Sequence, residues 1–366
     1  MKITLSVIKA DIGSIGGHIE PGRQLMDAVR KSIAQNGEGT IIGHNVTHCG
    51  DDIAILMTHT KGEENEAVHK LAYDAFMDGT KLARQQGLYA AGQDLLKDTF
   101  SGNVKGMGPA VAEMEFEERP GEPFCVFTAD KTDPGAYNLP LYLMFADPMT
   151  NPGLMLSPAM RKGFRFTIMD VEHTEGDRVI ELNAPEDIYD IAALLRDNQR
   201  YVVETVHNRA EDEIAATVST TRLHNIAGTY TGKDDPVMLV RAQSQFPSTG
   251  EILAPFQIGH YVAGFMRGSH NGPLMPVAMN SGVAFFDGPP VVNCAAYSVH
   301  EGRLTEPSDP FAHPFWDQVR ARITDKAIEL RKQGFSGPAM LPMAELEYGG
   351  IKERLNRLND HFKVRS

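Results

Sequence analysis

Apolar residues recur along this chain in two periods, and segments of the two kinds are interleaved. Residues 2–9 alternate between apolar and polar positions, which predicts a strand, and helical spacing after Pro21 predicts a helix that Gly37 ends. Apolar positions between Glu63 and about Gln86 also follow helical spacing and predict a long amphipathic helix. Because strands come in clusters with helices between them, we expect a layered α/β (α+β) fold with mixed sheets.

The same two periods predict elements along the rest of the chain. Further strands are predicted at 53–57, 113–117, 124–128, 164–171, 178–182, 201–206, 214–220, 237–242, 260–266, 274–279, 283–286 and 291–299. Further helices are predicted at 185–198, 314–333 and 342–360. Residues 98–110 are rich in glycine and 132–163 in proline, so both are expected to be irregular. Since no repeat or linker divides the sequence, we expect residues 1–366 to form a single domain.

Composition and charge restrict the class of protein. Apolar residues make up 42% and charged residues 23%, which is typical of a soluble globular protein. The net charge of -13 argues against nucleic-acid binding, and no apolar run approaches the roughly 20 residues of a membrane span. The N-terminus lacks the pattern of a signal peptide. Three distant cysteines, Cys49, Cys125 and Cys294, are interpreted as reduced thiols, which predicts a cytoplasmic protein.

The segment from Thr229 to Asp235 places four reactive groups around one glycine. They are the phenol of Tyr230, the amine of Lys233 and the carboxylates of Asp234 and Asp235. Neighbouring carboxylates raise the pKa of a lysine, whereas a nucleophilic amine needs a lowered one. Divalent cations bound to the aspartates would reverse this effect and lower the pKa of Lys233. The alternative is an ordinary turn before a strand, because glycine, aspartate and proline are typical turn residues.

Aspartates gather at the ends of predicted strands. Two come directly after strands and four directly before them: Asp11 and Asp130, then Asp51, Asp52, Asp234 and Asp235. The end of one strand and the start of its antiparallel neighbour share one edge of a sheet, so these carboxylates could meet there. So many carboxylates together need cations, and oxygen ligands favour Mg²⁺ or Mn²⁺. Alternatively the pattern reflects only the preference of aspartate for turns.

A second metal pattern is weaker. His44, His48 and Cys49 have spacing that a zinc site could use. No second pair of cysteines accompanies them, so a structural interpretation is favoured. The sequon at Asn45 carries no weight in a cytoplasmic chain.

Basic and polar residues near the acidic segments fit a phosphorylated substrate. Lys131 follows Asp130, and Arg267 lies at the end of a predicted strand. Gln93 and Asn103 could serve as a metal ligand and a substrate donor. Each of these residues, like Tyr348 near the C-terminus, has an equally simple interpretation as a solvated surface residue.

Long motifs in this chain resemble a known family. They are the opening segment 2–18, the Cys-Gly-Asp-Asp run at 49–52, residues 128–132, residues 228–236 and the Glu-Tyr-Gly-Gly run at 347–350. Together they resemble the bifunctional fructose-1,6-bisphosphate aldolase/phosphatase of archaea and deeply branching bacteria, a class V fructose-1,6-bisphosphatase. The likeness covers essentially the whole chain.

The resemblance implies a fold and two successive reactions. The fold would be a single-domain layered α-β-β-α sandwich, assembled as a homo-octamer, with mobile loops that exchange the two catalytic arrangements. Dihydroxyacetone phosphate and glyceraldehyde 3-phosphate would condense to fructose 1,6-bisphosphate. Hydrolysis of its C1 phosphate would then give fructose 6-phosphate, which makes the protein a gluconeogenic lyase and hydrolase.

The resemblance also implies a role for individual residues. Lys233 would form a Schiff base, Tyr230 would transfer protons, and Asp11 would accept the proton of the attacking water. Several Mg²⁺ ions, with Mn²⁺ as a substitute, would be held by Asp11, His18, Asp51, Asp52, Gln93, Asp130, Asp234 and Asp235. Substrate contacts would come from His18, Tyr89, Gly102, Asn103, Lys131, Gln243, Ser244, Arg267, Asp287 and Tyr348.

Two other functions stay open at this point. One is a Mg²⁺-dependent sugar-phosphate phosphatase alone, in which Lys233 only binds phosphate. The other is a non-catalytic acidic oligomer whose aspartates bind cations as structural ions. The latter gives no use to a lysine and a tyrosine placed beside the ligands.

Overall fold

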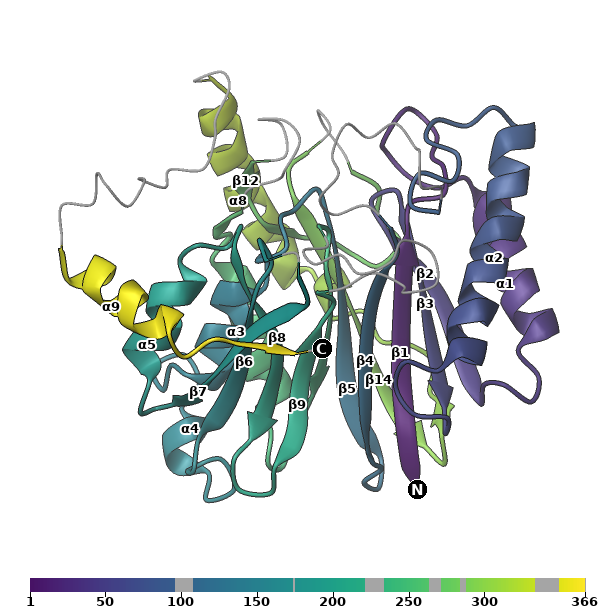
Figure 1. The fold of residues 1–366 in the computed structure, drawn as a ribbon. Coiled ribbons are helices and arrows are strands. Elements are labelled where there is room, and N and C mark those ends of the chain that lie inside the picture. The colour runs from purple at the N-terminus through teal and green to yellow at the C-terminus, as the bar shows by residue number, and fades with distance from the viewer. Residues whose placement is uncertain are drawn as a thin grey trace.

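Two stacked β-sheets lie between two layers of helices (Figure 1). The computed structural model describes residues 1–95, 108–173, 175–220, 234–262, 271–283, 288–332 and 349–365. Within them the smaller sheet has the strand order β2-β3-β1-β4. Its strands are β1 Lys2–Ala10, β2 Gly43–Cys49, β3 Asp52–His59 and β4 Ala110–Glu117, all antiparallel to their neighbours.

The larger sheet has the order β13-β14-β5-β10-β9-β8-β6-β7-β16, with β15 paired to β14. Its strands are β5 Glu122–Asp130, β6 Phe164–Asp170, β7 Asp177–Ala184, β8 Tyr201–Asn208, β9 Glu213–Val218, β10 Val237–Arg241, β13 Met275–Pro276, β14 Val291–His300, β15 Arg303–Leu304 and β16 Lys363–Arg365. β13 runs parallel to β14 whereas the other pairs are antiparallel, so the sheet is mixed. Two further strands, β11 Tyr261–Val262 and β12 Gly272–Pro273, pair with each other.

Helices cover the outer face of each sheet (Figure 1). The smaller sheet carries α1 Arg23–Asn36 and α2 Glu66–Gln85. The larger sheet carries α3 Asn138–Phe145, α4 Gly153–Leu156, α5 Ile188–Leu195, α7 Thr249–Leu253, η1 Ala254–Gln257, η3 Pro310–Ala312, α8 Phe315–Lys332 and α9 Gly349–Asn359. None of the helices in the described residues has both the length and the hydrophobicity that crossing a membrane requires.

The alternation of β1 explains the layering. Ile3, Leu5 and Val7 face the larger sheet and pack with residues of β5, β10 and β14. Ile8 and Ala10 face the other way and pack under α1 and α2. Since β1 is buried on both faces, side chains at alternate positions fill two separate cores. The predicted α-β-β-α sandwich with mixed sheets is therefore confirmed.

Most predicted elements are present, one prediction was wrong and one strand was missed. Residues 132–163 are not all irregular, because they contain α3 and α4. Pro140 lies in the first turn of α3, where its missing N–H costs no helical hydrogen bond. β2 was not predicted as a strand because it is mostly polar. The predictions at 98–107, 263–266, 284–286, 333 and 342–348 lie outside the described residues.

Candidate active site

Four chain segments end at one edge of the stacked sheets. Asp11 follows β1, and Asp51 occupies the tight turn before β3, where Ala10 pairs with Ile53. In the larger sheet, Asp130 ends β5 and Asp235 precedes β10, a strand whose Val237 lies opposite Thr128. Both strand pairs are antiparallel, so in each sheet the end of one strand lies beside the start of its neighbour. Stacking of the two sheets then brings the acidic ends together.

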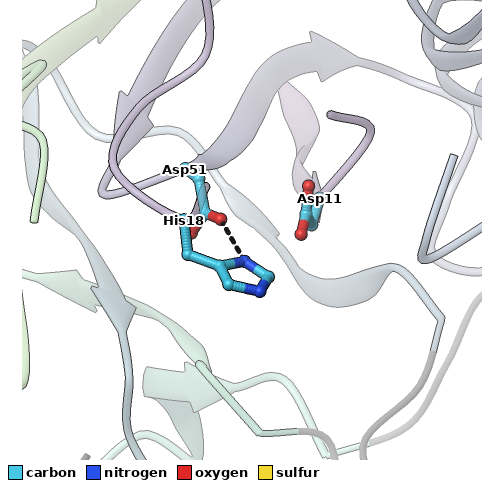
Figure 2. A group of neighbouring side chains, drawn as sticks. All are labelled: Asp11, His18 and Asp51. Atoms are coloured by element: carbon cyan, nitrogen blue, oxygen red, sulfur yellow. Dashed lines mark hydrogen bonds and ion pairs between the residues drawn. The ribbon is translucent and has the colours of Figure 1, made fainter. Parts of the chain in front are cut away.

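The first group of candidate metal ligands consists of Asp11, His18 and Asp51, whose ligand atoms all lie within 4.8 Å of one another (Figure 2). Nδ1 of His18 lies 2.9 Å from Oδ2 of Asp51. The same carboxylate oxygen accepts a hydrogen bond from the Ser14 hydroxyl at 3.3 Å. Asp11 and Asp51 are buried, whereas His18 is partly exposed to solvent.

The second group consists of Asp52, Asp130 and Asp235, again with ligand atoms within 4.8 Å. It joins the two sheets directly, because the backbone N–H of Asp51 donates to Oδ2 of Asp130 at 3.3 Å. Asp235 is held from the larger sheet, where its Oδ1 accepts a hydrogen bond from the N–H of Thr132 at 2.6 Å. The two groups are adjacent, since Asp51 and Asp52 are consecutive residues.

Two buried ammonium groups lie among these carboxylates. Nζ of Lys131 is 2.6 Å from Oδ1 of Asp51 and 3.1 Å from Oδ1 of Asp130, so it connects the two groups. Lys9, on β1, forms an ion pair with Asp52. Only 1% of the Lys9 side chain and 7% of the Lys131 side chain is exposed. The positive charges are therefore internal parts of the cluster.

Burial and mutual repulsion shift the pKa values of the cluster in opposite directions. Burial, followed by the charges of neighbouring aspartates, raises the pKa of Asp11 well above its ordinary value, and burial does the same for Asp130. Burial would also raise the pKa of Asp51, but Lys131 and His18 outweigh it and lower that pKa. Burial would lower the pKa of Lys131, but Asp130 and Asp51 raise it well above its ordinary value. The two ligand groups thus contain more carboxylates than the cluster contains ammonium groups.

The donor set fits hard divalent cations. Both groups offer mainly carboxylate oxygens, with the imidazole of His18 as the one nitrogen donor. Oxygen donors of this kind suit Mg²⁺ or Mn²⁺ better than zinc. The zinc alternative has no such support. His44 is exposed and Cys49 is fully buried, and neither belongs to a metal-ligand group within the described residues.

A turn after α2 closes over the first group. Asp94 and Asp11 exchange hydrogen bonds: the N–H of Asp11 donates to Oδ2 of Asp94 at 2.9 Å, and the N–H of Asp94 donates to the Asp11 carbonyl at 3.0 Å. The ring of Tyr89 stands edge-on to His18, with 4.7 Å between centroids. Gln93 lies between these two contacts in sequence, and its expected role as a ligand stays a prediction.

Gln243 and Ser244 lie at the other end of β10 from Asp235. The strand register puts them beyond Arg241, opposite the start of β5, on the order of 20 Å from the acidic cluster. Both have positive φ, 69° and 63°, and the Gln243 carbonyl accepts a hydrogen bond from Arg119 at 3.0 Å. A single chain does not bring them to the cluster.

Several expected site residues cannot be located. Gly102, Asn103, Tyr230, Lys233, Arg267, Asp287 and Tyr348 lie outside the described residues. Asp234 is described; it adjoins Asp235 and is half-buried. The roles assigned to all these residues therefore stay predictions.

Sequence reasoning missed three residues that shape the cluster: Lys9, Ser14 and Asp94. Lys9 precedes Asp11 by two positions on β1, so the period of a strand puts both side chains on the same face. That signal was available, because a lysine inside an otherwise apolar strand is unusual. The contact of Asp94 with the Asp11 backbone joins distant segments and has no comparable signal in the sequence.

Comparisons with known proteins agree along the full length of the chain. Residues 2–363 match the family described as fructose-1,6-bisphosphatase. A fructose-1,6-bisphosphate aldolase/phosphatase from Thermus thermophilus is 57% identical over 99% of this chain and 100% of its own length. Proteins of the same name from Cenarchaeum symbiosum and Methanothermobacter marburgensis are 51% and 47% identical, over 98% and 99% of this chain and 94% and 99% of their own lengths.

Proposed function

The chain belongs to the fructose-1,6-bisphosphatase family, and we propose that it is a bifunctional fructose-1,6-bisphosphate aldolase/phosphatase. It condenses dihydroxyacetone phosphate with glyceraldehyde 3-phosphate and then hydrolyses the C1 phosphate of the product to give fructose 6-phosphate. The observation that supports this most is the buried pair of carboxylate groups connected by Lys131. Anionic ligands for cations beside a buried ammonium are suited to a phosphorylated substrate.

In the hydrolytic step, the carboxylates and Lys131 surround the C1 phosphate. Asp11 accepts a proton from the attacking water, which suits a buried carboxylate whose pKa is raised. Lys131 binds phosphate oxygens through its ammonium, and His18 with Tyr89 positions the substrate from the partly exposed side. Mg²⁺ would be held by Asp11, His18, Asp51, Asp52, Gln93, Asp130, Asp234 and Asp235. When bound, Mg²⁺ supplies positive charge that stabilises the transferring phosphoryl group.

In the condensation step, Lys233 is the nucleophile. Its amine adds to the ketone carbon of dihydroxyacetone phosphate, water leaves, and the resulting Schiff base allows the neighbouring carbon to lose a proton. Tyr230 transfers that proton. The new carbon–carbon bond forms to the aldehyde carbon of glyceraldehyde 3-phosphate, and the aldehyde oxygen takes up the proton. Water then hydrolyses the Schiff base, which releases fructose 1,6-bisphosphate and the free amine of Lys233. This proposal relies on the sequence motif and on the names of the relatives, because both residues lie outside the described residues.

Three assays with the purified protein test both steps. Incubation with the two triose phosphates and Mg²⁺ should yield fructose 6-phosphate and inorganic phosphate, and EDTA should abolish the phosphate. Borohydride added with dihydroxyacetone phosphate should attach mass to the peptide that contains Lys233. Phosphate release from fructose 1,6-bisphosphate without condensation or trapping would favour the phosphatase-only alternative. Absence of both activities would favour the other alternative, a non-catalytic oligomer whose aspartates only bind cations.

We also propose that the protein acts as a homo-octamer, in which one copy completes the site of another. The position of Gln243 and Ser244 supports this, since these expected substrate contacts lie at the far end of β10 from the acidic cluster. Another copy of the chain would have to present them to the substrate. Native mass spectrometry should give a mass of eight chains. A monomer with full activity would contradict the proposal.

We finally propose a cytoplasmic location. Cys49, Cys125 and Cys294 are buried and form no disulfide, as expected of a protein kept in a reducing compartment. Fractionation of cells that produce the protein, followed by immunodetection, should find it with cytoplasmic markers. Recovery with secreted proteins would contradict the location.

A further inference from the structure

Lys9 is a fully buried lysine at the border between the core and the acidic cluster. It lies opposite Ala54 of β3 and Ala110 of β4, and two positions before Asp11. The neighbouring Val7, on the same face of β1, belongs to the core between the sheets. An ammonium group loses its hydration there, and such a loss costs several kcal/mol unless a partner compensates for it. The partner is Asp52, whose side chain is 6% exposed.

The two lysines of the cluster contact different carboxylates. Lys131 contacts Asp51 and Asp130, whereas Lys9 contacts Asp52. The two ligand groups contain five carboxylates, which is three more than the two ammonium groups beside them. Bound divalent cations would balance this excess. Lys9 contacts Asp52 from inside the fold, on the side of the core between the sheets.

We propose that Lys9 is a permanent internal cation that fixes the Asp52 carboxylate and compensates its charge whenever the metal positions are empty. This inference depends on the proposed role of Asp52 as a metal ligand. It makes Lys9 a positioning residue, since its ammonium faces the ligand rather than the substrate. The acidic cluster can then lose and exchange Mg²⁺ while the sheets stay stacked.

The proposal predicts that the fold becomes dependent on metal when Lys9 loses its charge. Lys9→Met keeps most of the unbranched side chain but removes the ammonium that contacts Asp52. In EDTA the variant should unfold about 5 °C below the wild type. In saturating Mg²⁺ the difference should shrink to less than half, because the bound cation compensates the carboxylate. Lys9→Arg, which keeps the charge, should behave in both conditions much as the wild type does.

A matched control is available at the end of β10 that lies away from the acidic cluster. Arg241 of β10 is also fully buried and paired with a buried carboxylate, Glu122, at 3.1 Å. Arg241→Met should lower the unfolding temperature equally in EDTA and in Mg²⁺, because no cation can replace its charge there. The wild type alone tests the proposed metal site, since Mg²⁺ should raise its unfolding temperature. A wild type that Mg²⁺ does not stabilise would contradict the metal site itself. A wild type that Mg²⁺ stabilises, with a Lys9→Met variant that loses equal stability in both conditions, would contradict only the Lys9 proposal.

The measurement is thermal unfolding of the full chain at one scan rate, with and without Mg²⁺. A double variant adds a second test. Lys9→Met combined with Asp52→Asn should be more stable in EDTA than Lys9→Met alone, since the buried carboxylate charge that Lys9 contacts is gone. If Lys9→Met folds only when Mg²⁺ is present, the proposal is supported. Equal destabilisation in both conditions, failure to fold even with Mg²⁺, or additive effects in the double variant would overturn it.

Discussion

Gly50 lies directly against the carboxylate of Asp130. It has a φ of +56°, and a Cβ at this position would stand 1.5 Å from Oδ2 of Asp130. The turn between β2 and β3 therefore approaches the end of β5 more closely than any other residue type would allow. This contact holds Asp51 and Asp52 of the smaller sheet beside Asp130 of the larger one. The two ligand groups meet because residue 50 is glycine.

Gly50→Ala should therefore damage the site more than the fold. The added methyl group pushes the Asp51–Asp52 turn away from Asp130, and a misplacement of about 1 Å at a catalytic site costs roughly 100-fold in rate. Mg²⁺-dependent phosphate release from fructose 1,6-bisphosphate should fall by that order. Gly39→Ala is the control, because Gly39 also has a positive φ, 74°, but no atom lies within 4 Å of its added Cβ. Equal activity in the two variants would contradict the explanation.

Asp52→Asn should reduce phosphate release by more than about 100-fold, because a ligand oxygen is replaced by an amide nitrogen and the charge that binds the cation is lost. Initial rates measured across Mg²⁺ concentrations check this. The control is Asp170→Asn: Asp170 is equally buried but pairs with Arg178 and Arg200, far along the sheet. That variant should lose stability and keep its activity at low temperature. An unchanged rate for Asp52→Asn would remove this residue from the ligand set.

The sequence predicts the parts of this site better than their assembly. Alternation along β1 and the aspartates at strand ends predict which residues border the sheets. They do not predict that Asp51 contacts Asp130, because that contact joins different sheets. Stacking depends on apolar surfaces such as those of Leu5 and Leu239, whose partners cannot be identified from one sequence.

One further failure has a physical reason, and one expected contact crosses a long distance. α3 lacks a polar face, since it is covered on several sides, so it gives no helical period to detect. Gln243 and Ser244 follow β10, whereas Asp235 precedes it, and the length of the strand separates them within one chain. Their expected contact with the substrate therefore stays a prediction.

Lys233→Ala should separate the two activities. Without the amine no Schiff base forms, so condensation of the triose phosphates should fall by on the order of 1,000-fold or more. Hydrolysis of added fructose 1,6-bisphosphate should largely persist, because the carboxylates that would hold Mg²⁺ are intact. Both rates should be measured on one preparation, with Lys81→Ala, an exposed lysine on α2, as the control. Parallel loss of both activities would show that Lys233 serves hydrolysis as well.

His260 should make the protein less stable in mild acid. Burial lowers the pKa of its imidazole to about 4, and Nε2 donates to the Ala136 carbonyl at 3.0 Å. Below the ordinary pKa of about 6.5 the unfolded chain binds a proton that the folded chain does not. The contribution of this histidine to folding is therefore complete above about pH 6.5 and is lost as the pH falls toward 4, by roughly 2 to 3 kcal/mol at pH 4.5.

His260→Gln removes this titration and can retain a donor for the Ala136 carbonyl. The free energy of unfolding, measured with urea at one protein concentration, should therefore fall less for the variant than for the wild type between pH 7 and pH 4.5. His300→Gln is the control, because His300 is exposed at the end of β14 and should follow the wild-type profile. Wild type and His260→Gln profiles that run parallel over this range would mean that His260 is protonated in the folded protein as readily as in the unfolded chain.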